Sequence, residues 1–321
     1  MTESTTHTPR AGRPVASPTS RQGRSPLAVP GTVARPVGPS PAPPQLSSPT
    51  RKGTALAAGL ALVLVALAFL VPLAWLLLAS VNPSATVSVT VPSEPTLDNF
   101  RSVLSPELTY TPLLNSLIIS GSTALITVAV AVLAAYPLSR YKMRFNRAFL
   151  YTILFGSCLP ITAVMVPVYA LFVALGLLDS LPGTILFLAA TSLPMAVWMM
   201  KNFMDSVPIS LEEAAWVDGA SAMQALRRIV VPLMRPGLAV VFIFVFTQAW
   251  GNFFVPFVLL LDPAKQPAAV SIYTFFGTNG AIAYGQLAAF SVIYSVPVLV
   301  LYLLVQRLAG GSFALAGSVK G

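Results

Sequence analysis

A polar stretch between two long apolar runs holds the residue types best suited to a specific contact with another surface. Residues 210–232 read SLEEAAWVDGASAMQALRRIVVP and lie between the apolar runs 184–200 and 237–261. Charged side chains gather in and beside the stretch: Lys201, Asp205, Glu212, Glu213, Asp218, Arg227, Arg228 and Arg235. Such charge density is costly inside a bilayer, so we expect a loop in water.

The first half of this stretch carries signals for a short helix. Ser210 and Glu213 have the Ser-x-x-Glu spacing of a capping box, which predicts a helix that begins at Leu211. Gly219 can adopt the left-handed conformation that ends a helix, so we expect the end near Asp218.

A second short helix is predicted after the glycine. Ser221 and Gln224 repeat the capping spacing, and the helix should run toward Val231 and be ended by Pro232. Small side chains around the bend let another surface approach the backbone: Ala214, Ala215 and Ala220. The alternative is an amphipathic segment that only anchors the loop to lipid headgroups.

The chain offers few groups for covalent or metal chemistry. It has one histidine, His7, and one cysteine, Cys158, so neither an intrachain disulfide nor a His/Cys metal cluster is possible. The phosphate-binding pattern G-x-x-x-x-G-K-[ST] is absent, so ATP hydrolysis by that route needs another chain. We therefore expect no enzyme activity, no metal and no cofactor, and we expect Cys158 to be buried in its apolar run.

Composition places the chain among polytopic membrane proteins. It has 321 residues, of which 55% are hydrophobic and 9% charged, and its mean hydropathy is +0.78. We predict an all-α fold with six transmembrane helices, at about 54–81, 112–138, 148–175, 183–203, 237–261 and 286–307. The apolar cores of these runs hold no Asp, Glu, Lys, Arg or His, which disfavours a proton-coupled carrier. A sodium-coupled carrier or a passive channel stays open.

Loop charges predict the orientation. Most basic residues near the six runs fall on one side, and the other side has only Arg101 and Lys265. Those on the first side are Arg51, Lys52, Arg140, Lys142, Arg144, Arg147, Lys201, Arg227, Arg228, Arg235, Arg307 and Lys320. The positive-inside rule makes the first side cytoplasmic, with both termini inside. The net charge of +9 comes with no nucleic-acid motif, so lipids are the expected partners of these charges.

The chain is predicted to have two parts. Residues 1–52 are basic and rich in Pro, Ser and Thr, and they form a disordered N-terminal extension because they have too few apolar residues for a core. Residues 53–321 form the membrane domain, and 205–236 form its polar loop.

One predicted span combines polar and aromatic side chains that suit a sugar. The candidates are Thr247, Gln248, Trp250 and Asn252. Sugars offer hydroxyls for hydrogen bonds and C–H faces for aromatic stacking. The alternative is that the amides hold helices together and the tryptophan anchors the interface.

The polar stretch resembles the EAA loop of binding-protein-dependent ABC importer permeases. The matching residues are Glu213-Ala214-Ala215, Asp218-Gly219-Ala220 and Ile229-Val230-Val231-Pro232. In that family the loop is a coupling helix seated in a cleft of the ATPase subunit. The resemblance therefore implies coupling roles for Glu213, Ala214, Ala215, Asp218, Gly219, Ala220 and Pro232.

Flanking sequences resemble the carbohydrate branch, and the end of the chain is similar to the tail of the maltose-type permease, which reaches the ATPase dimer. Segments 194–203 and 285–289 resemble the carbohydrate branch, and 317–321 resembles the tail. The chain departs from the family at Trp250-Gly251-Asn252-Phe253, where the family has Trp-Asn-Glu-Phe. The resemblance implies a sugar or oligosaccharide permease in a bacterial cell membrane. It implies an ATP-binding subunit dimer, a second homologous permease and an extracytoplasmic solute-binding protein as partners.

Two alternatives remain. One is a self-sufficient channel or secondary transporter. The other is an ABC permease for a non-sugar solute, such as polyamine or glycerol phosphate.

Overall fold

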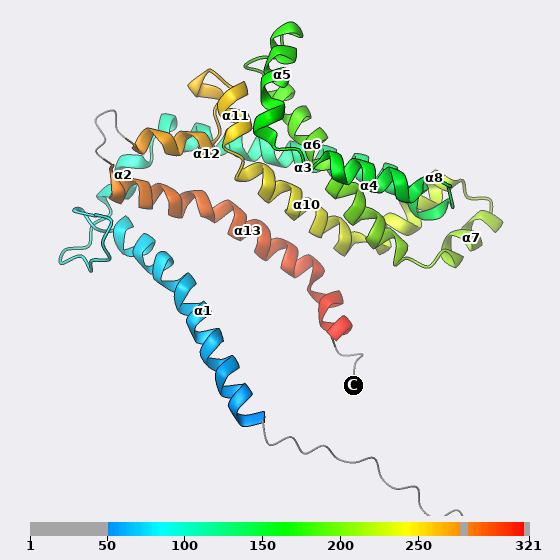
Figure 1. Cartoon of the computed structure of the whole chain (residues 1–321), viewed down its shortest axis with the longest axis horizontal. Helices are drawn as coiled ribbons and strands as arrows, with labels where there is room; N and C mark the ends of the chain where they lie inside the picture. Colours follow the sequence, from blue (N-terminus) through cyan, green and yellow to red (C-terminus); the bar gives the residue numbers. More distant parts are fainter. Residues whose placement is uncertain (1–50, 277–281, 318–321) are drawn as a thin grey trace, which may run out of the picture. The chain divides into compact units, whose positions relative to one another are not determined.

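The computed structural model describes residues 51–276 and 282–317, with side chains for 56–276 and 282–307 (Figure 1). The predicted extension falls almost entirely outside the described residues, as do His7 and the last residues of the tail, 318–321. Residues Gly59–Gly321 form one compact unit. Every regular element in the described part is helical, apart from one isolated bridge between Phe276 and Ile282, and this confirms the all-α expectation.

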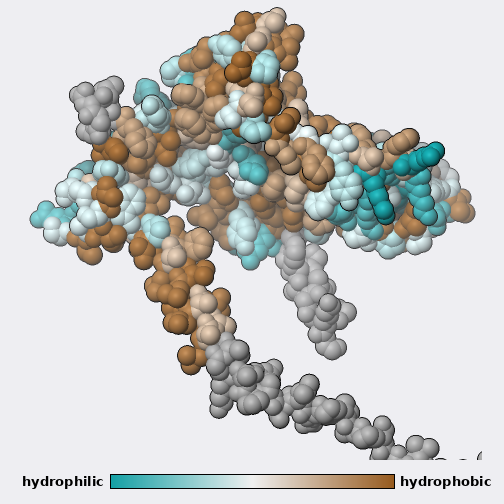
Figure 2. All heavy atoms as spheres, in the orientation of Figure 1, coloured by the Kyte–Doolittle hydropathy of each residue, from teal (hydrophilic) through white to brown (hydrophobic). Residues whose placement is uncertain are grey.

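Among the residues that the structure describes, four helices are long and apolar enough to cross a membrane, and they confirm four of the predicted spans. They are α1 (Arg51–Ser80), α3 (Thr111–Arg140), α6 (Leu181–Asp205) and α13 (Tyr284–Gly317). The most apolar window of α1 has no residue buried against the rest of the chain, and Figure 2 shows its hydrophobic surface. A helix with apolar side chains on all sides is suited to lipid contact.

The predicted span 148–175 is bent in the structure, because two helices that together are long and apolar enough to cross a membrane meet there at 87°. They are α4 (Asn146–Gly156) and α5 (Ile161–Ala174). Pro160 stands at the break with φ −58° and ψ 125°, and it lacks the N–H that a continuous helix would use. Cys158 lies in this break and is exposed, so the expected burial of Cys158 is wrong.

The predicted span 237–261 is also interrupted. Helix α10 (Arg235–Trp250) ends at Gly251, and α11 (Phe254–Leu259) follows. The Val255 N–H donates to Asn252 Oδ1 at 3.0 Å, so this side chain caps the second helix. The 16 residues of α10 extend about 24 Å, which is less than the roughly 30 Å of a bilayer's hydrocarbon core.

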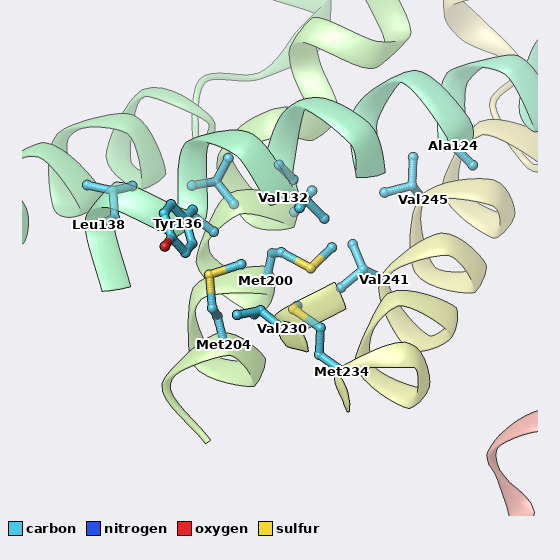
Figure 3. Packing of buried hydrophobic residues seen from close by; sticks show 14 of the residues in the cluster. Ala124, Val132, Tyr136, Leu138, Met200, Met204, Val230, Met234, Val241 and Val245 are labelled. Atoms are coloured by element: carbon cyan, nitrogen blue, oxygen red, sulfur yellow. The ribbon is translucent and has the colours of Figure 1, made fainter. Parts of the chain in front are cut away.

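The largest core cluster lies where α3 packs against α6 and α10. Figure 3 shows Met200, Met204, Val230, Met234 and Val241 converging there. Small side chains let the helices approach closely, and those that are fully buried are Ala124, Ala131, Ala135 and Ala196. At the start of α10, a Cβ on Gly237 would lie 2.5 Å from Phe203 Cγ, so only glycine fits this crossing.

Short helices between the long ones form a second packed layer. They are α2 (Asp98–Val103), η1 (Pro106–Tyr110), η3 (Pro263–Lys265), α12 (Ala268–Ser271) and η4 (Ile272–Phe275). Asn115 Nδ2 donates to the carbonyls of Ala264 and Gln266 at 2.8 and 3.1 Å, and Ser116 Oγ accepts from Ala268 N at 2.9 Å. Polar side chains of α3 therefore hold the 262–271 segment.

Candidate functional site

The first helix of the polar loop, α7 (Ser210–Val217), begins one residue before its predicted start. Its N-cap is Ile209, which has helical dihedrals, and no side chain caps it. The Glu213 N–H, which the Ser210 side chain would have to accept in the predicted box, donates instead to Ile209 O at 3.0 Å, and the Glu212 N–H donates to the same carbonyl at 2.9 Å. The predicted capping box of Ser210 and Glu213 is therefore wrong, because the preceding turn already accepts from these donors.

The predicted bend between the two helices is confirmed. Gly219 has φ +87°, and open space surrounds the position of its missing Cβ, so the requirement for glycine is conformational. The following capping box is also confirmed. The Ser221 side chain accepts from Gln224 N at 3.3 Å, and Ser221 N donates to Gln224 Oε1 at 2.8 Å.

The second helix passes through Pro232, so the prediction that this proline ends it is wrong. Three consecutive pieces form the helix: α8 (Ala222–Ala225), the π-helical turn η2 (Leu226–Val230) and α9 (Val231–Leu233). In the wide turn, Val231 N donates to Leu226 O, five residues back. This change in pairing lets the helix continue past a residue without an N–H, and the break comes at Met234, where the axis bends by 79° into α10.

One face of this helical hairpin is exposed and mixes apolar with acidic side chains. Val217 is 89% exposed, Met223 51% and Leu211 44%. Glu213, Ala214, Asp218 and Gly219 are exposed, whereas Ala215 and Ala220 are half-buried. The surface has no means of covalent catalysis, and its shape and composition suit docking into a groove.

The opposite face of α7 is held by a buried carboxylate. Glu212 is 0% exposed, its Oε1 lies 2.5 Å from Arg140 Nε, and its Oε2 accepts from Tyr136 Oη at 2.9 Å. Sequence reasoning counted Glu212 among the charges of a loop in water and missed this pair. No local pattern could have found it, since the partners are 72 residues apart.

A cavity with apolar walls and several uncharged polar side chains lies at the break between α4 and α5 and at the end of α10. A hollow of about 360 Å³ is lined by Leu154, Ser157, Leu188, Thr191, Ser192, Met195, Phe244, Gln248, Ala249 and Asn252. A neighbouring hollow of about 550 Å³ shares Ser157, Thr191 and Asn252. No charged side chain lines either hollow among the described residues.

The polar side chains of the lining mostly present oxygen atoms that can still accept a hydrogen bond. The hydroxyls of Ser157, Thr191 and Ser192 donate to carbonyls of their own helices at 2.7, 3.0 and 2.8 Å. Each hydroxyl oxygen can therefore still accept from a ligand. The amides of Gln248 and Asn252 add N–H donors, so the cavity suits an uncharged molecule rich in hydroxyls.

The four predicted substrate residues separate into two pairs. Gln248 and Asn252 line the cavity. Thr247 instead donates to the carbonyls of Ile243 and Phe244, and it is not among the lining residues. Trp250 is 3% exposed and stacks between aromatic rings at 5.5 and 5.2 Å, those of Phe246 and Tyr294. The hydroxyl residues of the lining were missed, although their position inside apolar runs was a usable signal.

Long apolar helices, an exposed helical hairpin and a cavity at two broken helices are typical of the membrane subunit of a transporter, which crosses the membrane several times. Residues 127–311 match the family described as "Binding-protein-dependent transport system inner membrane component", and the chain belongs to this family. It is a permease subunit of the ABC type, a transport component and not an enzyme.

Relatives in several organisms match most of the chain. The trehalose transport system permease protein SugB of Mycobacterium tuberculosis is 32% identical over 255 residues, which are 78% of this chain and 93% of the relative. The glucose import system permease protein GlcU of Saccharolobus solfataricus is 31% identical over 271 residues, 82% of this chain and 94% of the relative.

Solved structures share the fold. A bacterial ABC transporter involved in the import of the acidic polysaccharide alginate aligns with a TM-score of 0.70 at 24% identity. The alignment covers 81% of this chain and 98% of that one.

Proposed function

We propose that this permease subunit carries a neutral sugar or oligosaccharide into the cell. The observation that carries the proposal is the uncharged cavity, to which Ser157 and Thr191 contribute hydroxyls and Asn252 an amide. An acidic sugar would need cationic groups to offset the loss of its hydration, and the cavity offers none among the described residues. Relatives named for trehalose and glucose transport support a neutral substrate.

The hairpin α7–α8 is the coupling element of this proposal. It would seat in a cleft of an ATP-binding subunit, with Glu213, Ala214, Ala215, Asp218, Gly219 and Ala220 at or near the contact and Pro232 at its membrane end. Exposed Val217 and Met223 support this role, since exposed apolar side chains beside a bend suit a buried interface. ATP hydrolysis would take place on that partner.

The whole assembly would contain this chain, a second homologous permease, two ATP-binding subunits and an extracytoplasmic solute-binding protein. Closure of the ATPase dimer would move the hairpin, and the cavity would change from inward-facing to outward-facing. Six membrane crossings, the two bent pairs each counting as one, would place both termini in the cytoplasm of a bacterial cell. In this arrangement the membrane domain is 53–321 and the coupling loop is 205–236.

Uptake of labelled sugars by cells with and without the gene tests the proposal. The panel contains trehalose, glucose and diacetylchitobiose, with a uronic-acid oligosaccharide as the charged control. Deletion should abolish the uptake of at least one neutral sugar, and a plasmid copy should restore it. Unchanged uptake of every neutral sugar would overturn the proposal, as would ATP-independent solute flux through the purified chain alone in liposomes.

A further inference from the structure

The buried pair Glu212–Arg140 joins two elements that lie far apart in the sequence. Both carboxylate oxygens of Glu212 are used, one by Arg140 Nε at 2.5 Å and one by Tyr136 Oη at 2.9 Å. The Glu212 and Arg140 side chains are 0% and 5% exposed. Arg140 and Tyr136 both lie in the last turns of α3, so the carboxylate of α7 is fixed to the end of that helix.

Arg140 also holds the chain that leads into α7. Its Nη2 donates to Val207 O at 3.2 Å, in the linker after α6. Its Nη1 donates to Ser139 Oγ at 3.1 Å, and Ser139 Oγ donates to Asp205 Oδ1 at 2.5 Å, at the end of α6. The last turn of α3 therefore contacts the end of α6, the linker and α7.

The two faces of α7 differ in a way that suits the transmission of movement. Glu213 is exposed on the face that is free to meet a partner, and Glu212 is buried on the face toward α3. Apolar side chains can slide past one another, whereas a buried carboxylate fixed at one oxygen by an ion pair with Arg140 and at the other by the Tyr136 hydroxyl has a defined geometry. Helix α3 in turn packs along α6 and α10, which carry Thr191 and Gln248 of the cavity.

We propose that the Glu212–Arg140 pair, completed by Tyr136, is the joint through which displacement of α7 reaches α3 and hence the cavity. Glu212 is then a positioning residue, because it touches neither the substrate nor the partner. The inference rests on the proposed function, since it assumes that an ATP-binding subunit moves α7. A contact that only stabilised the fold would leave transport intact once stability was restored.

The test separates these roles with a single and a double variant in the assembled complex. Glu212→Ala leaves Arg140 buried without its partner, and this change is expected to lower stability as well as transport. The double variant Glu212→Ala/Arg140→Ala removes both charges, so no unpaired ion is left buried. The matched control is Asp98→Ala, which removes a carboxylate from an exposed pair with Arg101. Each variant is assayed for co-purification of the ATP-binding subunit, ATP hydrolysis and uptake of the sugar that the unaltered complex carries.

A distance measurement gives a readout that needs neither substrate nor partner. Spin labels at Val217→Cys in α7 and Leu125→Cys in α3, both exposed, are placed in a Cys158→Ala background of the full-length chain. With the Glu212–Arg140 pair intact, the distance between the two spin labels should have one narrow distribution. The double variant should give a broad one, because α7 is no longer held to the end of α3.

We expect the double variant to retain the ATP-binding subunit and its hydrolysis but to lose at least tenfold in transport, while Asp98→Ala changes neither. Near-normal transport with a narrow distance distribution would overturn the inference. If the double variant does not assemble, Glu212→Gln serves instead, since it keeps the volume and can hydrogen-bond to both partners without the charge. Glu212→Gln should reduce transport several-fold and broaden the distribution, and normal values for both would equally overturn the inference.

Failure of the proposed function has a different signature. In that case the unaltered complex itself imports no sugar of the panel or retains no ATP-binding subunit. The spin-label measurement on the unaltered chain would still report whether α7 and α3 are joined.

Discussion

At the scale of single residues, two neighbouring carboxylates have opposite surroundings. Glu212 is fully buried against Arg140, whereas Glu213 is exposed. One residue turns a helix by about 100°, so adjacent side chains of α7 face different sides. The exposure of Glu213 agrees with the sequence prediction that this polar stretch lies in water. The burial of Glu212 could not be predicted, because its partner is distant in sequence and a single chain gives no evidence of pairing.

The variant Gly237→Ala tests how closely α10 packs against α6 at their crossing. A Cβ at this position would lie 2.5 Å from Phe203 Cγ and 2.8 Å from Phe203 Cβ, so Gly237→Ala must displace the half-buried Phe203 side chain. Overpacking of this kind costs about 1–3 kcal/mol, which exceeds the gain of about 1 kcal/mol in helix propensity. Thermal unfolding of the purified chain in detergent should therefore show a lower Tm.

The control is Gly121→Ala in α3, where a Cβ would meet nothing within 4 Å. This variant should unfold at the same or a higher temperature. An unchanged Tm for Gly237→Ala would show that α6 and α10 can separate without cost.

Asp179 should give a stability contribution that depends on pH. Hydrogen bonds from the Asp262 backbone N–H and the Lys265 ammonium hold the pKa of the Asp179 carboxyl below its usual range. The same carboxylate raises the pKa of the Lys265 ammonium. The acid therefore stabilises the fold above its unfolded pKa of about 4, and this contribution is lost as the pH falls through its lower folded pKa. The lysine contributes below its unfolded pKa of about 10.4, and its contribution is lost as the pH rises through its higher folded pKa.

The variant Asp179→Asn measures the acidic limb of this dependence. Asp179 has φ 59°, a conformation that asparagine tolerates, so the backbone should be retained. We expect the variant to melt below the unaltered chain at pH 7 and the difference to shrink below about pH 4. A Tm difference that stays constant from pH 7 to pH 3 would contradict the role of this charge.

At the scale of elements, hydropathy predicts where apolar helices run but gives no information on where they break. Helices α3, α6 and α13 follow from long apolar runs that exceed the length a bilayer requires. The breaks at Pro160 and Asn252 have apolar sequence on both sides, so a window average passes over them. At the first break Pro160 lacks a backbone N–H, and at the second the Asn252 side chain accepts from the backbone N–H of Val255. Tertiary packing decides whether either feature interrupts the helix.

Ala215→Glu tests the hairpin as a docking element. Ala215 is half-buried near the middle of α7, and glutamate is nearly as good a helix former as alanine. Burying an unpaired charge at an interface costs several kcal/mol. Because about 1.4 kcal/mol corresponds to a tenfold change in affinity, the ATP-binding subunit should bind weaker by orders of magnitude. The variant should reach the membrane at normal levels but lose the ATP-binding subunit on purification and import nothing.

The matched control places the same charge elsewhere. Ser93→Glu lies in the exposed segment between α1 and α2 and should leave assembly unchanged. Normal co-purification and transport by Ala215→Glu would favour the alternative, in which the hairpin lies against lipid headgroups.

At the scale of the whole molecule, the charge distribution predicts a topology with six crossings. Single cysteines at Ser93 and Leu261, both exposed, should react from outside with an impermeant thiol reagent in a Cys158→Ala background. A cysteine at Met223 should react only after the membrane is opened. Labelling of Met223→Cys in intact cells would reject the orientation.

The buried Glu212–Arg140 pair also sets an order of events during synthesis. Arg140 is made 72 residues before Glu212, an interval of roughly 4–14 s at about 5–20 residues per second. During that interval the guanidinium has no carboxylate to bury with, so it must stay hydrated at the end of α3. The last turn of α3 therefore reaches its final contacts only after α6 and α7 have been made, and a chain that ends before Glu212 leaves the Arg140 guanidinium without its carboxylate.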